Sequence, residues 1–291
     1  KDEQLVLKIA ERILTGEYPA FGEIWKPLEF SEPLAGYHWT LAEKKFKGDI
    51  KWVWEPARFT WAIYLAYAFS ITQDEKFPRY FWKKLNEFIE KNPKDKGLNW
   101  VSGQEISLRL IAFTFCLNIF RYSQGTSEVN IQRILTYSYD HALRIPVTLA
   151  YAVAQKNNHL VSEAVGMLTA AYLFSNEKVA SVWNKKGIFW LNKVIRTHFY
   201  PNGAYIQQST NYHRLVLQLF LWAKYVGNGN VFLLDNLQVI QKAVNWLYEF
   251  TDPISGEMSN LGHNDGAKLF PSFAGEFRLA ADTIQAVSLS F

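Results

Sequence analysis

Two polar stretches of the chain carry side chains that could move protons on a substrate. Residues 156–166 place an amide pair and the imidazole of His159 directly before an apolar helical pattern. Residues 207–213 end in Tyr212 and His213. A Ser–His–Asp order and a cysteine pair, which other chemistries use, do not occur in these stretches. The set therefore favours removal of a carbon-bound proton next to a carboxylate over hydrolysis or phosphoryl transfer.

Asn158 and His159 also have a purely structural interpretation. Asn is a preferred N-cap of helices, and His159 with Glu163 would form an ordinary i,i+4 pair. Side chains at a helix start nevertheless point into whatever cleft that end faces. There the Asn158 amide could bind a substrate carboxylate and stabilise the charge that builds on it. The spacing alone leaves both interpretations open.

Tyr212 needs particular neighbours before it can act as a base. Gln208 and Tyr212 are spaced to share one helix face, whereas His213 diverges from Tyr212 by about 100°. A half-buried tyrosine that donates to a backbone carbonyl is the structural alternative. A tyrosine acts as a base only if cations or donors lower its pKa from about 10. His159, His213 or Arg58 could do so if the fold brings one of them close.

Two further clusters combine tryptophan with charged side chains. Ion pairs along a helix are their structural interpretation. The functional alternative is a sugar platform of tryptophan rings beside Arg58, which would clamp a carboxylate. The residues concerned are Trp52, Trp54, Glu55 and Arg58 in the first cluster, and Trp100, Glu105 and Arg109 in the second.

A tight polar loop, residues 261–266, is the last candidate. It holds His263 and Asn264 between two glycines that permit unusual backbone angles. An ordinary turn explains this pattern as well as a binding loop does, and a single histidine adds little.

The elements that must position these residues are helical. Apolar residues recur at helical spacing in about ten segments, with a spacing of about 25 residues between them, and strand-like alternation is nearly absent. We predict one all-α domain over residues 1–291, built from antiparallel helical hairpins. Residues 18–48, with three prolines, are predicted to be a long loop, and Pro146 should kink or split the helix over residues 127–154. The last helix is predicted at residues 273–289.

Composition narrows the possible functions. Hydrophobic residues make up 49% of the chain and charged residues 20%, so a large core is expected. The net charge of +4 mildly favours an anionic ligand, and no Lys/Arg block suggests nucleic acid. No apolar run reaches transmembrane length. Cys116 lies in an apolar run, so we expect it to be buried, and a single cysteine permits no internal disulfide.

Five stretches together resemble the heparinase II/III-like polysaccharide lyases, a group that includes oligo-alginate lyases. They are residues 48–58, 99–109, 157–163, 202–214 and 260–267, in the order of the family. The resemblance implies an incomplete (α/α) toroid followed by a β-sandwich domain. The chain ends where the toroid would end, so we expect the toroid portion without the C-terminal β-sandwich. We expect a periplasmic or secreted location, with the cytoplasm as the alternative, since residues 1–4 are no secretion signal but could be the trimmed start of an exported protein.

The resemblance implies roles by position. Asn158 matches the amide that neutralises a uronate carboxylate, Tyr212 the proton-transferring tyrosine, and His159 a histidine that some relatives use as a base. No metal or organic cofactor is required. The residues expected to bind substrate are Arg58, Trp54, Trp52, Trp100, Glu105, Gln208, His213, His263 and Asn264.

We therefore predict a lyase that cleaves a 4-linked, uronic-acid-containing acidic polysaccharide by β-elimination. One alternative is a glycoside hydrolase, which needs two carboxylates from among Glu55, Glu105, Glu163 and Asp265. Another is a non-catalytic domain that binds acidic glycans. If the lyase hypothesis is right, Asn158, His159, Tyr212 and Arg58 should converge on one cleft lined by Trp52, Trp54 and Trp100.

Overall fold

The computed structural model describes residues 2–22, 24–32, 34–272 and 277–291. Within these ranges it is an all-α, incomplete α/α toroid, as predicted. The first half contains α1 (Asp2–Leu14), β1 (Glu17–Ala20), β2 (Ile24–Pro27), α2 (Trp39–Lys45), α3 (Lys51–Ala57), α4 (Thr60–Thr72), α5 (Lys76–Lys91), η1 (Leu98–Trp100), α6 (Gly103–Phe120) and α7 (Glu128–Arg144). The second half contains η2 (Ile145–Val147), α8 (Leu149–Gln155), α9 (Asn158–Leu173), α10 (Ala180–Thr197), α11 (Thr210–Val226), α12 (Leu234–Glu249) and α13 (Ala281–Ser290).

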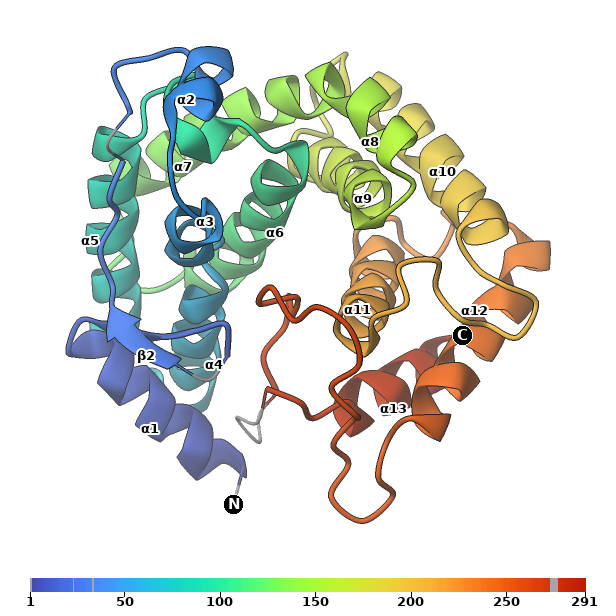
Figure 1. The fold of residues 1–291 in the computed structure, drawn as a ribbon. Coiled ribbons are helices and arrows are strands. Elements are labelled where there is room, and N and C mark those ends of the chain that lie inside the picture. Colours follow the sequence, from blue (N-terminus) through green and yellow to red (C-terminus); the bar gives the residue numbers. More distant parts are fainter. Residues whose placement is uncertain (1, 23, 33, 273–276) are drawn as a thin grey trace.

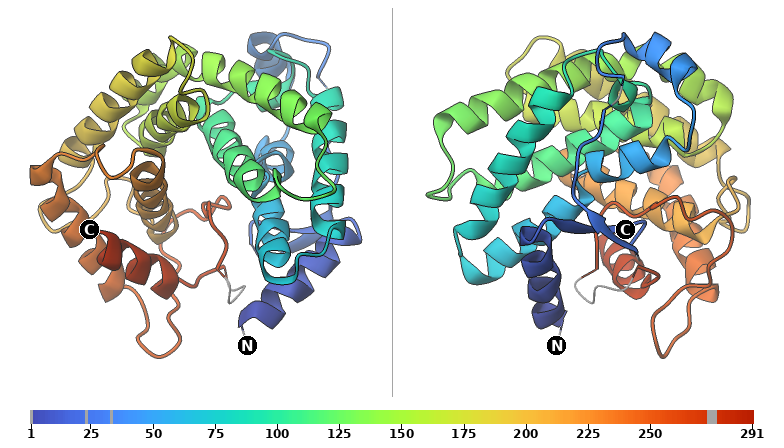
Figure 2. Two further views of the ribbon diagram at one scale, coloured as in Figure 1. Left: turned by 180° about the vertical axis from the view of Figure 1, so that it is seen from behind. Right: turned by 60° about the vertical axis from the view of Figure 1, so that its left-hand side comes forward.

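The helices follow one another around an open arc (Figure 1). Helices α4, α6, α9 and α11 line the inner side, and α5, α7, α10 and α12 cover the outer side. The arc stays open between α1 and α13, which the view from behind also shows (Figure 2). After α12, residues 259–272 run back into the middle of the arc, toward α3 and α11. This return brings the loop at residues 260–266 next to helix ends far away in the sequence.

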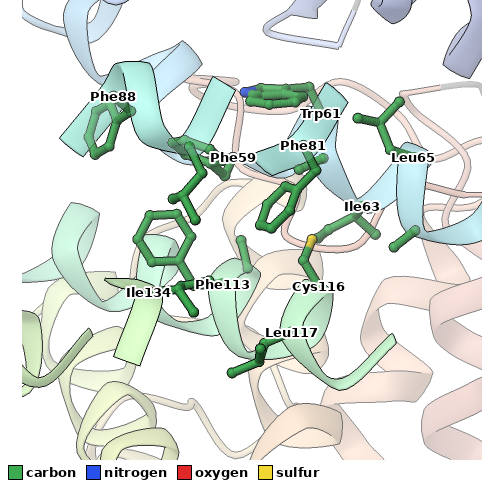
Figure 3. Packing of buried hydrophobic residues seen from close by; sticks show 14 of the residues in the cluster. Phe59, Trp61, Ile63, Leu65, Phe81, Phe88, Phe113, Cys116, Leu117 and Ile134 are labelled. Carbon is green, nitrogen blue, oxygen red and sulfur yellow. The ribbon is translucent and has the colours of Figure 1, made fainter. Parts of the chain in front are cut away.

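The core follows the same division. One apolar cluster is centred on α4, α5 and α6, and a second on α9, α10, α11 and α12. In the first, the Phe59 ring packs edge-on against Phe113 at 4.9 Å and Phe88 at 5.1 Å (Figure 3). Cys116 lies in this cluster and is buried, as predicted. Such packing of large rings holds the inner helices in place relative to one another.

Some predicted boundaries need correction. The predicted loop over residues 18–48 contains the antiparallel hairpin β1–β2 and helix α2. The helix predicted at residues 273–289 begins only at Ala281, and residues 273–276 lie outside the described residues. The predicted break at Pro146 is confirmed: α7 ends at Arg144, a short 3-10 turn follows, and α8 starts at Leu149.

Candidate active site

Tyr212 lies in the first turn of α11, near the middle of the arc. Ser209 caps this helix, and its Oγ accepts the backbone N–H of Tyr212 at 3.3 Å. The Tyr212 side chain is 8% exposed, and its hydroxyl donates to Oδ2 of Asp265 at 2.9 Å. Burial and the Asp265 carboxylate raise the pKa of Tyr212, and the opposing effect of Arg58 is smaller. The lowered pKa that Tyr212 would need in order to act as a base is therefore absent, and its hydroxyl is a neutral donor.

Asp265 comes from the returning loop. Its Oδ1 accepts a hydrogen bond from Nζ of Lys51 at 2.8 Å, across 214 residues of sequence. Partial burial acts to raise the pKa of Asp265, but the bonds from Lys51 and Tyr212 hold it below its ordinary value. Asp265 is therefore a carboxylate that bridges an ammonium group and a phenol.

Arg58 is surrounded by protein acceptors. Its Nε and Nη2 donate to the two carboxylate oxygens of Glu105 at 2.6 and 2.9 Å. Its Nη1 donates to Glu55 Oε2 at 2.8 Å and to the backbone oxygen of Asp265 at 2.7 Å. The predicted Glu55–Arg58 pair is confirmed, and the bonds of Arg58 and Glu105 to protein groups favour a structural role over the substrate contacts predicted for them. Both side chains already satisfy each other inside the protein.

The alternative pairing of Glu105 with Arg109 was wrong. Arg109 donates instead to the backbone oxygens of Ala57 at 2.6 Å and Asn99 at 3.2 Å. The guanidinium of Arg109 is fully buried, and it holds the end of α3 and the turn η1 against α6.

Asn158 is free of the capping role that its position suggested. The N-cap of α9 is Asn157, whose Oδ1 accepts the backbone N–H of His159 at 3.0 Å. The Asn158 side chain is 2% exposed, and its Nδ2 donates to Oε1 of Gln104. The backbone N–H of Asn158 donates to Oε1 of Gln207 at 3.2 Å. Asn158 is therefore directed toward the start of α6 rather than along its own helix.

One small cavity joins these groups. Arg58, Gln104, Tyr212 and Asp265 line it, and Gln104 links it to Asn158. Its volume of about 10 Å³ holds a water molecule rather than a sugar. The cavity therefore has no room for a sugar ring, and solvent reaches these residues where the Asp265 side chain is 22% exposed.

His159 lines a different, larger cavity of about 290 Å³, with Trp39, Trp54 and Tyr151 among its walls. Its ring stands edge-on to Tyr151 at 5.9 Å, and its Nδ1 is buried without a partner. Burial lowers the pKa of His159, so the ring is a neutral imidazole. Of the four residues expected to converge, Tyr212 and Arg58 line the small cavity, Asn158 reaches it only through Gln104, and His159 belongs to the neighbouring cavity.

The predicted His159–Glu163 pair does not form. The Glu163 carboxylate is fully buried, and its Oε2 accepts from Thr148 Oγ1 at 3.5 Å. Burial raises its pKa to about 8. One turn further along α9, Glu163 contacts Thr148, which precedes α8, rather than the His159 ring.

The predicted aromatic and histidine ligands separate into distinct places. Trp100 is fully buried, with its ring 4.7 Å from His141, so its predicted place in the cleft was wrong. His213 is also fully buried, donates to the backbone oxygen of Ala243 at 2.8 Å, and stacks on Trp246. Its predicted contact with substrate was wrong because its helix face points into the core.

Trp52 and Trp54 diverge from each other. Trp52 is 44% exposed and stands edge-on to Phe21. Trp54 donates from Nε1 to the backbone oxygen of Leu98 at 2.9 Å and lines the cavity that contains His159. Gln208 precedes α11 with a φ of 48° and lines a third cavity, of about 560 Å³. It therefore does not share a helix face with Tyr212.

His263 and Asn264 shape the loop that carries Asp265. The backbone oxygen of His263 accepts from Ser209 Oγ at 2.8 Å, and Asn264 Oδ1 accepts the N–H of Gly266 at 3.0 Å. The His263 side chain is exposed. These two residues therefore help to hold the loop that carries Asp265. Their predicted contact with substrate stays a prediction.

Sequence reasoning missed Gln104, Lys51 and the contact that Asp265 makes with Tyr212. Each of these residues lies inside a stretch that carried the family resemblance. The family resemblance therefore pointed to the right stretches. It could not show that residues as far apart as 214 positions in the sequence form a hydrogen bond.

A family model described as "Heparinase II/III N-terminus" matches residues 25–268. The chain belongs to this family. It is 25% identical over 268 residues to a heparin-sulfate lyase of Bacteroides stercoris, covering 84% of this chain and 38% of the relative. It is 24% identical over 299 residues to a heparin-sulfate lyase of Pedobacter heparinus, covering 89% and 44%. The chain thus spans less than half the length of these curated relatives.

Solved structures of this heparinase family share the fold. A heparan sulfate lyase HepC from Pedobacter heparinus has a TM-score of 0.62 at 21% identity, covering 87% of this chain and 39% of that one. The heparinase III BT4657 gene product has a TM-score of 0.62 at 19% identity, covering 88% and 43%. In the described ranges no helix is long and apolar enough to cross a bilayer. The same ranges contain no group of three or more His, Cys, Asp or Glu side chains that could hold a metal ion.

Proposed function

We propose that the protein containing this chain is a polysaccharide lyase that cleaves a uronic-acid-containing polysaccharide by β-elimination. Membership of the heparinase II/III family supports the lyase class. The observation that carries the proposal is one small cavity lined by Tyr212 and Gln104, with the amide of Asn158 hydrogen-bonded to that of Gln104. A proton donor and carboxylate-binding amides at one place are what elimination next to a carboxylate requires.

The amides would bind the uronate carboxylate. An amide nitrogen has two N–H donors, and the bond to Gln104 uses one of those of Asn158. The second can donate to the carboxylate attached to C5. Charge from C5 moves onto that carboxylate as the C5 proton leaves, and a donor in a water-poor site stabilises this charge. Asn158 would therefore lower the barrier to proton removal.

Tyr212 would supply the proton to the leaving oxygen. The electron pair of the C5–H bond forms the C4–C5 double bond while the C4–O4 bond breaks. The Tyr212 O–H bond then breaks as O4 takes its proton. Because the neutral Tyr212 cannot also take the C5 proton, that proton would go to the neutral imidazole of His159.

The carboxylates fit hydrolysis poorly. A glycoside hydrolase needs two carboxyl groups free to act across one bond. Glu55 and Glu105 are engaged by Arg58, Asp265 is engaged by Lys51 and Tyr212, and Glu163 is fully buried. The larger cavity with Trp54 and Tyr151 could instead hold a neighbouring sugar against aromatic rings.

A polymer panel tests the proposal. The full gene product should be incubated with heparan sulfate, chondroitin, hyaluronan, alginate and bacterial capsule polymers, with heparan sulfate first because the named relatives are heparin-sulfate lyases. An increase in ultraviolet absorbance from a C4–C5 double bond would support a lyase. New reducing ends without that absorbance would indicate a hydrolase. Binding without cleavage would indicate a glycan-binding domain.

A further inference from the structure

Three residues from distant segments form a linear chain of hydrogen bonds. Tyr212 of α11 donates to Oδ2 of Asp265 at 2.9 Å, and Lys51 of α3 donates to Oδ1 of the same carboxylate at 2.8 Å. The two donors therefore use different oxygens, and the carboxylate is fixed from both sides. We infer that Asp265 is a positioning residue for Tyr212: its carboxylate holds the tyrosine hydroxyl in place as the proton donor, and Lys51 holds the carboxylate. This inference rests on the proposed lyase function.

The backbone of Asp265 is held as firmly as its side chain. Its φ is 49°, in the left-handed region that aspartate and asparagine enter more readily than most residues other than glycine. Here Nη1 of Arg58 donates to the Asp265 backbone oxygen at 2.7 Å. A Cβ on Gly266 would come within 2.6 Å of Glu55, so the loop lies directly against the Arg58 cluster.

The loop does not need the Asp265 carboxylate in order to fold. Ser209 Oγ donates to the backbone oxygen of His263 at 2.8 Å. The backbone N–H of Thr210 donates to the backbone oxygen of Leu261 at 3.1 Å. Together with the Arg58 contact, these bonds tie the loop to α11 and α3 through main-chain atoms. The carboxylate is thus available for Tyr212, and its loss should alter Tyr212 more than it alters the loop.

The charges around Tyr212 define what the Asp265 carboxylate does. In the described part of the chain, five ionisable groups act on Tyr212 or Asp265 or are acted on by Tyr212: Lys51 of α3, Arg58 after it, Glu105 of α6, Tyr205 before α11 and His263 of the loop. Glu55 pairs with Arg58 rather than facing Tyr212. Arg58 favours the phenolate, but burial and Asp265 outweigh it, so the phenol keeps its proton. A sugar alkoxide is more basic than a phenolate, so a protonated Tyr212 can still transfer its proton to O4.

Two substitutions in the full gene product test this inference. Asp265→Asn removes the negative charge, and Lys51→Met leaves that charge uncompensated. The titration of Tyr212 is followed by NMR on isotope-labelled tyrosine rings, with the signal assigned by its loss in Tyr212→Phe. We expect the Tyr212 pKa to fall in Asp265→Asn and to rise or stay unchanged in Lys51→Met. Asp252→Asn, an exposed turn aspartate, is the control and should change neither the titration nor the activity.

Kinetics on the cleaved polymer complete the test. We expect Asp265→Asn to lower kcat on the order of 10- to 100-fold with little change in KM, because the donor loses its alignment. The alkaline limb of the kcat profile should move to lower pH, in step with the NMR titration. A loss of kcat with an unmoved pH profile and an unmoved Tyr212 titration would overturn the inference, since it would mean that Asp265 only supports the loop.

The two readouts separate this inference from the proposed function. If no polymer is cleaved by the unaltered protein, the lyase proposal fails, while the NMR titration still shows whether Asp265 controls the Tyr212 hydroxyl. If Asp265→Asn does not fold, Lys51→Met decides: a fall of the Tyr212 pKa in that variant would contradict the chain of bonds described above.

Discussion

Arg58 and Glu105 form a two-pronged ion pair in which two guanidinium nitrogens meet the two carboxylate oxygens at 2.6 and 2.9 Å. Both side chains are almost completely buried, at 6% and 1% exposure. The pair joins the end of α3 to the first turn of α6. Because Arg58 also holds the backbone of Asp265, the pair connects the helical arc to the loop that reaches Tyr212.

This pair should matter for stability. Glu105→Gln leaves the buried Arg58 charge without its main partner, and loss of one partner of a buried pair costs about 3 kcal/mol or more. We expect a decrease of that size in the free energy of unfolding, measured by urea denaturation. The matched control is Glu90→Gln, which removes the exposed pair with Arg133 and should cost less than about 1 kcal/mol. Equal losses in both variants would contradict this account.

Glu163 should make stability depend on pH. Its ordinary pKa is 4.5, and burial raises it to about 8 in the folded protein. Between these values the folded state keeps a proton that the unfolded state has released, so stability falls as pH rises. This contribution is fully present below pH 4.5 and is lost as pH rises through about 8.

Glu163→Gln should remove that pH dependence. Each pKa unit corresponds to about 1.4 kcal/mol of stability. From pH 5 to pH 8, the free energy of unfolding of Glu163→Gln should therefore rise by more than about 1 kcal/mol relative to that of the unaltered protein. Thermal or urea unfolding at a series of pH values measures the difference. A gain that does not grow with pH in this range would show that Glu163 is already ionised in the folded protein.

Tyr212→Phe should lower turnover by about 100-fold or more, since a general acid is lost. The ring and its packing stay, so the unfolding midpoint should change little. Ultraviolet absorbance of the product gives the rate once the polymer is known. Tyr248→Phe, at a tyrosine that is 55% exposed, is the control. Near-normal turnover of Tyr212→Phe would remove this residue from the mechanism.

Asn157 and Asn158 are neighbours with different expected roles, so they form a matched pair of tests. Asn157→Ala removes the N-cap of α9 and should cost about 1 kcal/mol of stability while largely preserving turnover. Asn158→Ala should lower turnover by about 100-fold or more, the usual effect of removing a donor to developing charge. Unfolding curves and turnover rates of both variants distinguish the two roles. A loss of turnover in Asn157→Ala, with turnover preserved in Asn158→Ala, would assign the chemical role to Asn157.

The sequence by itself determined the helical class, most helix positions and the family. These features depend on local spacing: apolar periodicity marks the helices, and Pro146 separates α7 from α8. The five motif stretches could be recognised in the same way, because each is a run of adjacent residues. It was also local spacing that identified Asn158 and Tyr212 as candidates.

Only the tertiary structure decided which partner each side chain meets. Spacing suggested that Glu105 pairs with Arg109, but the rotation of α6 turns it toward Arg58 of α3. Trp100 and His213 lie on faces that the neighbouring helices cover. Burial raises the pKa of Tyr212, and the Asp265 carboxylate, which the returning loop places against the hydroxyl, raises it further. Burial and long-range charge contacts arise only when helices pack, and a local pattern carries no information about which of its faces will be covered.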